Sequence, residues 1–186
     1  MKGFLEALNI LAERYQPYNL FNRFTADENV AVRAYSSYIN LLWSSTNTIN
    51  HFATMKPPKN LEERYLVVWG ALQAFIIQQD AIFKLHNIFV EAAKKKGFKL
   101  EDRAWQELRH LRDTVAGHPT EDANMVMIVA RDDNDWGVLV EVKGEATPIH
   151  SYICDRLEQY ETELLEAFGL IANGLERRAI SANQAE

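Results

Sequence analysis

Apolar residues recur every three or four positions over long runs of this chain, and that spacing constrains its fold more than any other feature. Positions 31, 35, 38, 42, 45, 49 and 52 are mostly apolar and fall on one face of a helix. A second stripe occupies positions 65, 69, 72, 76, 79, 83, 86 and 90. These helices are joined by connections too short to separate domains, so we expect an all-α fold with one domain over residues 1–186.

Local start and stop signals place the first two helices. Leucines and aromatic residues at helical spacing predict a short helix over residues 1–15, which Pro17 ends. Thr25 and Glu28 then form a capping-box pattern, in which each side chain can accept a hydrogen bond from an unpaired backbone amide. The second helix should begin there and stop at the prolines of "KPPK".

Three further helices follow from the same reasoning. Asn60 is placed to cap the third, which we expect to run as far as about Gly97. The fourth should extend from about Leu100 to Ala116. The last should begin at Pro148, a residue that fits a first helical turn.

One segment departs from helical spacing. In "MVMIVARDDNDWGVLVEV" two β-branched runs flank an acidic turn, which predicts a β-hairpin insertion near residues 124–143. The expected architecture is therefore an up-and-down bundle of four to five helices that carries this hairpin.

Composition narrows the functional classes. Twenty basic and twenty-six acidic residues give 20 − 26 = −6, so any contact with nucleic acid must be local. The single cysteine, Cys154, excludes an internal disulfide, and charges interrupt the N-terminal segment too early for a signal or spanning helix. These features predict a soluble cytoplasmic protein that does not interact with membranes.

Motifs for cofactors and metals are missing from the sequence. It contains no glycine-rich phosphate loop, no paired-cysteine zinc pattern and no His-Glu-x-x-His helix. A calcium loop starting at Asp132 would need an oxygen ligand at its fifth position, where Trp136 stands. We therefore expect no cofactor and no metal.

The end of the fourth helix holds the main candidate site. In "LRDTVAGHPT", Arg112 lies at the rim of the apolar face and His118 follows the helix-breaking Gly117. Pro119 restricts the backbone of His118 to extended conformations, which fixes the direction of its imidazole. About 9 Å of helix separates Arg112 from His118, and an arginine side chain can largely close that gap. Both side chains could then face one phosphate.

A purely structural interpretation also explains this segment. An arginine near a helix C-terminus binds free carbonyl groups, and a glycine followed by a proline commonly ends a helix. On spacing alone the stop signal is the simpler explanation.

The segment resembles the signature of the HEPN superfamily, α-helical domains found in RNA-cleaving toxins, antiviral systems and nucleotide-binding proteins. That signature is an arginine, four to six residues, then a histidine, often with a polar residue after the arginine. Here "RDTVAGH" gives Arg112, five intervening residues and His118, with Asp113 at the polar position. About seven residues carry the close match, and the predicted bundle agrees with the architecture.

The resemblance implies metal-independent cleavage of RNA. An imidazole such as His118 titrates near neutral pH and can take the proton of a ribose 2′-hydroxyl. The guanidinium of Arg112 can bind the charge that develops on the phosphate. The resemblance also implies a homodimer in which two motifs face one cleft, and it allows an antitoxin or another partner protein.

Three further residues are candidates for supporting roles. Asp113 follows Arg112, and Arg109 belongs to a cationic region that includes the lysines at 94–96. His86 lies on the apolar stripe of the third helix, together with Gln79, and a buried polar side chain needs a partner.

Two other functions remain open at this stage. The first is a non-catalytic HEPN-like module that binds a nucleotide or a protein partner. The second is a structural dimer that uses exposed aromatic residues such as Trp136 as an interface.

Overall fold

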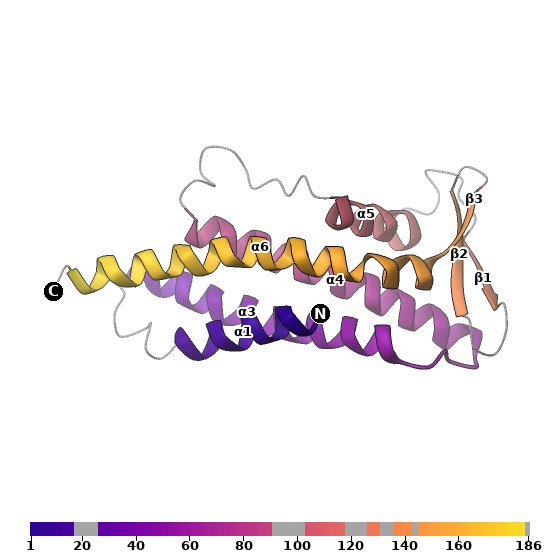
Figure 1. Ribbon diagram of the computed structural model, residues 1–186, viewed down its shortest axis with the longest axis horizontal. Coiled ribbons are helices and arrows are strands. Elements are labelled where there is room, and N and C mark those ends of the chain that lie inside the picture. Colours follow the sequence, from indigo (N-terminus) through magenta and orange to yellow (C-terminus); the bar gives the residue numbers. More distant parts are fainter. Residues whose placement is uncertain (17–25, 91–102, 118–125, 131–135, 143–144, 185–186) are drawn as a thin grey trace.

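A computed structural model of the chain describes residues 1–16, 26–90, 103–117, 126–130, 136–142 and 145–184. Five α-helices occur in these ranges, and Figure 1 shows them as an elongated bundle with a small sheet at one end. The helices are α1 (Lys2–Arg14), α3 (Ala26–Thr54), α4 (Leu61–Phe89), α5 (Arg103–Arg112) and α6 (Ile149–Gln184). The helical class that the sequence predicts is confirmed.

Contacts between side chains define the directions of the helices. On α4 and α6, Phe75 packs edge-to-face against Tyr160 with ring centroids 5.1 Å apart, and Arg178 donates to the carbonyl of Ile88 at 2.7 Å. These two helices therefore run in parallel. Helix α1 follows the same direction, because Phe4 contacts Phe168 and Arg14 pairs with Glu176.

Helices α3 and α5 run the opposite way. Gln78 of α4 donates to Thr46 of α3 at 2.7 Å, and Tyr35 near the start of α3 packs against Phe89 at the end of α4. On the other side, the first turn of α5 bonds to Glu163 of α6, whereas Glu107, later in α5, pairs with Arg156, earlier in α6. Helix α5 thus lies antiparallel to both α4 and α6.

The core runs along the whole bundle. It is built from large side chains that are under 2% exposed, and Phe4, Leu42, Phe52, Phe75, Leu85 and Tyr160 are among them. Burying such side chains contributes about 1.5–3 kcal/mol each, which is the main stabilisation available to the fold.

The predicted ends agree with the structure to within two residues for α1, for the end of α3 and for the start of α4. The fourth helix, expected from about Leu100 to Ala116, is α-helical over Arg103–Arg112 and continues as a π-helical segment, and Leu100 lies outside the described residues. Asn60 caps α4 as expected and accepts a hydrogen bond from the amide of Glu62 at 2.8 Å. The helix was expected to reach Gly97, but it ends at Phe89, and Val90 is extended. Arg178 of α6 provides a physical reason, because it binds the carbonyl of Ile88 and lies over the ring of Phe89.

Three strands form an antiparallel sheet in the order β1, β2, β3 at the end of the bundle where α6 begins (Figure 1). Strand β1 (Val126–Ala130) pairs with β2 (Trp136–Val142), and β2 pairs with β3 (Glu145–Pro148). The sequence did not predict β3. Pro148, expected in the first turn of the last helix, is instead the final residue of β3, directly before α6.

Candidate functional site

Helix α5 carries the first residue of the Arg112–His118 motif, and it has little helical stability of its own. It is ten residues long and rich in charged side chains. Isolated helices shorter than about 12 residues are marginal in water, so α5 depends on contacts with its neighbours. The position of Arg112 is therefore set by the groups that hold α5.

A carboxylate from α6 holds the start of α5. Glu163 is 6% exposed, and its two oxygens accept hydrogen bonds from the backbone amides of Ala104 at 3.1 Å and Trp105 at 2.8 Å. Gln159, one turn earlier on α6, donates to the same carboxylate at 3.0 Å. The amides at a helix N-terminus have no partners within the helix and carry its positive dipole, so a buried carboxylate there both satisfies and stabilises them.

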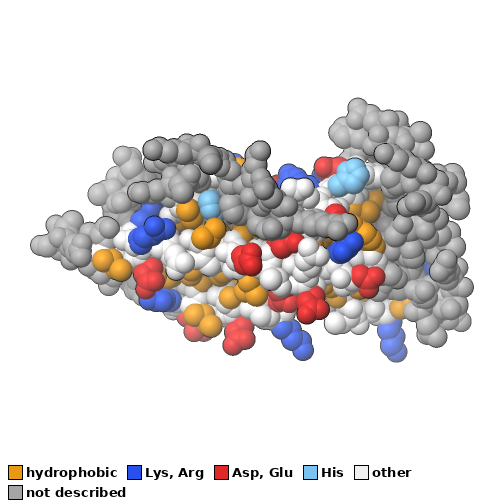
Figure 2. All heavy atoms as spheres, turned by 45° about the horizontal axis from the view of Figure 1, so that its top comes forward, with side chains coloured by type: hydrophobic (Ala, Val, Ile, Leu, Met, Phe, Trp, Pro, Cys, Tyr) orange, Lys and Arg blue, Asp and Glu red, His pale blue; other side chains and the backbone are white. Residues whose placement is uncertain are grey.

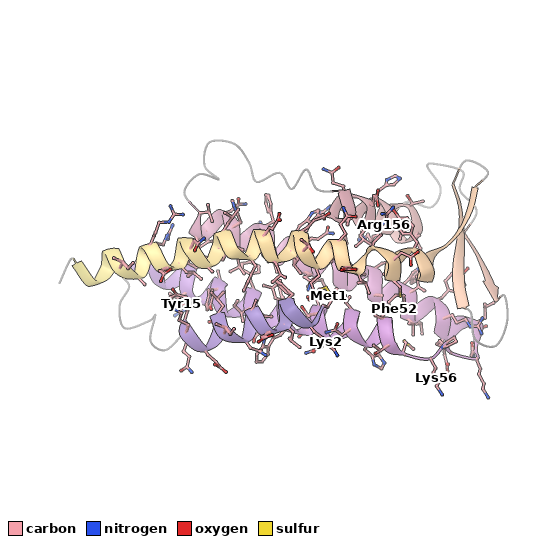
Figure 3. The ribbon with its side chains drawn as sticks, in the orientation of Figure 1. Met1, Lys2, Tyr15, Phe52, Lys56 and Arg156 are labelled. Atoms are coloured by element: carbon pink, nitrogen blue, oxygen red, sulfur yellow. The ribbon has the colours of Figure 1, made fainter. Side chains whose placement is uncertain are left out.

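Polar contacts with α4 and α6 continue along α5. Gln79 is fully buried, and its side-chain nitrogen donates to the carbonyl of Trp105 at 3.1 Å. This bond satisfies the donor, whereas the Gln79 Oε1 has no hydrogen-bonding partner among the described residues. Glu107 accepts hydrogen bonds from Tyr152 at 2.9 Å and pairs with Arg156 at 3.1 Å; Figure 3 labels Arg156 near the start of α6, below α5. Burial, and then this hydrogen bond, raise the pKa of the Tyr152 hydroxyl.

Arg109 makes the contact nearest to solvent. Its guanidinium pairs with Asp80 of α4 at 3.1 Å, and the two side chains are 47% and 57% exposed. An ion pair this exposed contributes roughly 0–1 kcal/mol. Arg109 therefore orients α5 on α4 only weakly. Asp80 also partly neutralises the positive charge of Arg109, which the sequence analysis proposed as support for phosphate binding.

Arg112 lies where α5 changes its winding. The helix continues as a π-helical segment, Asp113–Gly117. Such turns are rare in proteins, and those that occur often lie at functional sites. The Arg112 side chain is 31% exposed, and its Nη1 donates to Oδ1 of Asp113 at 2.8 Å. Within the described part of the chain its Nε is buried and has no hydrogen-bonding partner. The guanidinium is thus fixed at one edge, with donor capacity left over.

The π-helical segment is anchored on its inner side. Thr114 is 7% exposed and donates to the carbonyl of His110 at 2.9 Å, while Val115 is 4% exposed and belongs to the core. The chain therefore leaves α5 from a fixed point. His118 lies outside the described residues, so its distance from Arg112 stays a prediction.

His86 is not close to Arg112. The bond between Gln79 and Trp105 places these two residues at the same level of the bundle. Seven residues along α4 lead to His86 and seven along α5 lead to Arg112, in opposite directions. At 1.5 Å per residue, about 20 Å separates them along the bundle. His86 is 5% exposed, and burial lowers its pKa, which is the behaviour of a core histidine.

Charge on this side of the molecule is mixed. Figure 2 shows Lys and Arg side chains interspersed with Asp and Glu over the described part of the face that α5 occupies. Among the described residues no three His, Cys, Asp or Glu side chains are grouped so that they could hold a metal ion. Comparison of the chain with protein-family models, with curated proteins and with solved structures found no match.

Sequence reasoning missed the residues that position α5. Glu163 follows the buried Tyr160 by three residues, so its place on the packed face of α6 is visible in the spacing. A single glutamate beside an apolar stripe is nevertheless usually exposed, and only the docking of α5 shows what it binds.

Proposed function

We propose that the chain is a metal-independent endoribonuclease that uses Arg112 and His118, as the resemblance to the HEPN superfamily implies. The observation that carries this proposal is the placement of Arg112. A partly exposed guanidinium, held by a neighbouring carboxylate, lies at the end of a short helix that polar contacts hold from two sides. Such fixed donors stabilise charge that develops in a transition state without having to reorganise.

The chemistry would be an internal transesterification. His118 takes the proton of a ribose 2′-hydroxyl, and the 2′-oxygen attacks the adjacent phosphorus. The bond from phosphorus to the 5′-oxygen breaks, and that oxygen takes a proton from a second acid or from water. The products are a 2′,3′-cyclic phosphate and a 5′-hydroxyl. Arg112 stabilises the additional negative charge on the phosphoryl oxygens.

Asp113 has a definite role in this scheme. Its carboxylate orients Arg112 but also opposes the approach of a phosphate. Asp113→Asn keeps the acceptor oxygen and removes the charge. We expect this variant to bind RNA more tightly, with the larger gain at low salt, because the removed repulsion is electrostatic.

The test is cleavage of a fluorescently labelled single-stranded RNA in the presence of EDTA. His118→Ala should lower the rate about 10²–10⁴-fold, the usual contribution of a general acid or base. Arg112→Ala should lower it about 10²–10³-fold, as removal of a transition-state donor does. His51→Ala, at an exposed histidine near the end of α3, is the matched control and should cleave at the wild-type rate. Equal cleavage by wild type and His118→Ala would show that the activity comes from a contaminant.

The ion pair between Arg112 and Asp113 favours a second candidate function, a non-catalytic module that binds a phosphate or nucleotide. The carboxylate reduces the net charge beside the guanidinium, which weakens the case for catalysis more than the case for binding. In that case RNA stays intact under all conditions, and Arg112→Ala lowers the affinity for the nucleotide.

A further inference from the structure

Helix α4 exposes large apolar side chains on the side that faces solvent, as well as burying them on the side that faces the core. By length and composition alone it is the one helix of the described residues that could cross a membrane, and 56% of its most apolar stretch is buried inside the bundle. Leu66 is 67% exposed and Trp69 is 48% exposed, although both lie on a long helix of the bundle. Large apolar side chains that are exposed close together on one helix face often mark a surface that a partner covers.

Seven residues of α4, all exposed except the half-buried Ile77, form one stripe. They recur at intervals of three and four residues, which keeps them on the same face of the helix. We call this set the outer stripe; it consists of Glu62, Leu66, Trp69, Gln73, Ile77, Asp80 and Lys84. Gly70 borders it, and a side chain at Gly70 would meet nothing within 4 Å. The spacing is that of a seam where one helix packs along another.

The outer stripe is complementary to itself when reversed. Glu62 and Lys84 each lie eleven residues from Gln73, or roughly 16 Å along the helix. A two-fold axis at Gln73 would place Glu62 of one copy opposite Lys84 of the other, and Trp69 opposite Ile77. It would do so twice, as an isologous interface requires.

We propose that the outer stripe of α4 is the surface on which a second copy of this chain docks, antiparallel and with its two-fold axis at Gln73. The two pairs of Trp69 with Ile77, on either side of Gln73, form the apolar part of the interface, and the two pairs of Glu62 with Lys84 form its ends. Asp80 would lie opposite Leu66 of the second copy, and its carboxylate is already paired with Arg109. This proposal does not depend on the proposed ribonuclease activity.

The charges of the stripe favour a second copy over a lipid bilayer as the occupant. Glu62, Asp80 and Lys84 are all exposed on the stripe, and charged side chains within a bilayer are costly. In a dimer two of these charges acquire partners of opposite sign at the rim, where exposed ion pairs are common.

The first test compares two exposed tryptophans by sedimentation of the purified full chain over a range of concentrations. Trp69→Glu should shift the chain to a monomer. Trp43→Glu, which alters a tryptophan of similar exposure (42%) on α3, should leave the dimer intact. A wild-type chain that sediments as a monomer at every concentration, or a Trp69→Glu variant that dimerises like wild type, would overturn the proposal. Wild-type protein that floats with phosphatidylcholine vesicles, and does so less after Trp69→Glu, would overturn it in favour of a lipid surface.

The second test exchanges the charges, which leaves the apolar part of the interface and the folded monomer unchanged. Glu62→Lys alone and Lys84→Glu alone each place two like charges opposite each other. Each should weaken the dimer roughly tenfold or more, since exposed pairs contribute up to about 1 kcal/mol each. Mixing the two variants restores both opposite-sign pairs, so a heterodimer of wild-type strength should form. No gain on mixing would contradict the antiparallel pairing.

The third test fixes the register. In a Cys154→Ser background, Gln73→Cys places two thiols at the proposed two-fold axis, and mild oxidation should link the two chains. Lys84→Cys is the matched control, because its copies would lie roughly 33 Å apart and should stay unlinked. Linkage at position 84 but not at position 73 would show that the register is wrong.

Discussion

Helices α4 and α5 lie against each other, and they are held in the bundle by different forces. Helix α4 has 29 residues, and fourteen of them are buried, most of them apolar. Helix α5 has ten residues and buries only Ala104, Trp105 and Leu108 in the core. Polar contacts from Glu163, Gln79, Asp80 and Arg156 add to this burial. The long helix is held mainly by the apolar area that it buries, whereas the short helix buries less and relies more on a few directed hydrogen bonds.

This difference bears on function. Burial is non-directional, so a residue of α4 tolerates small shifts as long as volume is conserved. Hydrogen bonds to Ala104, Trp105 and Glu107 fix the first turns of α5, and Arg112 extends from its end. A site that must hold a guanidinium in place is better served by the second arrangement, provided that the polar groups keep their partners.

The largest effect should come from removing volume beneath α4. Phe75 is fully buried and packs against Tyr160, so Phe75→Ala loses apolar contact and leaves a cavity. We expect the free energy of unfolding to fall by about 3–5 kcal/mol in urea titration, with the whole bundle affected. A loss below 1 kcal/mol would show that α4 is not stabilised by burial in the way described.

Removing the cap of α5 should have a smaller and more local effect. Glu163→Ala leaves the amides of Ala104 and Trp105 without their acceptor, and we expect the free energy of unfolding to fall by about 1–3 kcal/mol, the usual cost of a buried hydrogen-bonding group that loses its partner. Hydrogen exchange should accelerate in α5 much more than in α3. Glu163→Gln, which keeps an acceptor oxygen, should lie between the alanine variant and wild type. Uniform acceleration over all helices would mean that α5 is not a separately held element.

Two glycines sharpen the comparison at the level of packing. A side chain at Gly174 of α6 would overlap the carbonyl group of Phe89 at the end of α4, so Gly174→Ala should destabilise the fold by about 1–3 kcal/mol. Gly70 on the outer stripe has open space, and in the monomer Gly70→Ala should stabilise α4 by about 0.5–1 kcal/mol. The melting temperatures of the Gly174→Ala and Gly70→Ala variants, measured by thermal unfolding, test these two expectations. If Gly174→Ala leaves the melting temperature unchanged or raises it, the close approach of α6 to Phe89 is not present in solution.

The smallest effect concerns the start of α1. Burial raises the pKa of Glu161. Hydrogen bonds from the amino group of Met1 and the amide of Phe4 together outweigh this effect, so the pKa lies below the usual 4.5. Figure 3 shows Met1 beside α6. A carboxyl with a depressed pKa stabilises the fold above its unfolded pKa, and this contribution is lost as the pH falls through the folded pKa.

Unfolding measured from pH 7 downwards should therefore show a loss of stability below about pH 4.5, the pKa of an unperturbed carboxyl. Glu161→Gln should remove part of that loss, because the variant carries no titrating carboxyl. Glu166→Gln, at an exposed position on the same helix, is the control and should follow the wild-type curve. Identical acid profiles for Glu161→Gln and wild type would rule out the depressed pKa.

The helical framework was predictable because its signals are local. In the sequence, the capping-box pattern of Thr25 and Glu28 and the prolines after Thr54 predict the bounds of α3, and Asn60 marks the start of α4. The end of α4 was not predictable, since Arg178, ninety residues later, binds its carbonyl. Contacts between distant segments leave no periodic signal in the sequence.

The candidate site was predictable only in part, and for the same reason. The motif identified Arg112 and His118, and the structure places Arg112 at the end of α5 beside Asp113. The supporting residues depend on tertiary contacts. Arg109 pairs with Asp80, His86 lies about 20 Å away along the bundle, and Glu163 was not anticipated at all.

The most direct measurement of the central claim is the chemistry of the RNA ends. A defined single-stranded RNA is incubated with wild-type protein and with His118→Ala in EDTA, and the fragments are identified by mass spectrometry. The account predicts 2′,3′-cyclic phosphate and 5′-hydroxyl termini with wild type, and intact RNA with His118→Ala. Fragments with 3′-hydroxyl termini, fragments that persist in the variant, or RNA left intact by the wild-type protein would contradict it.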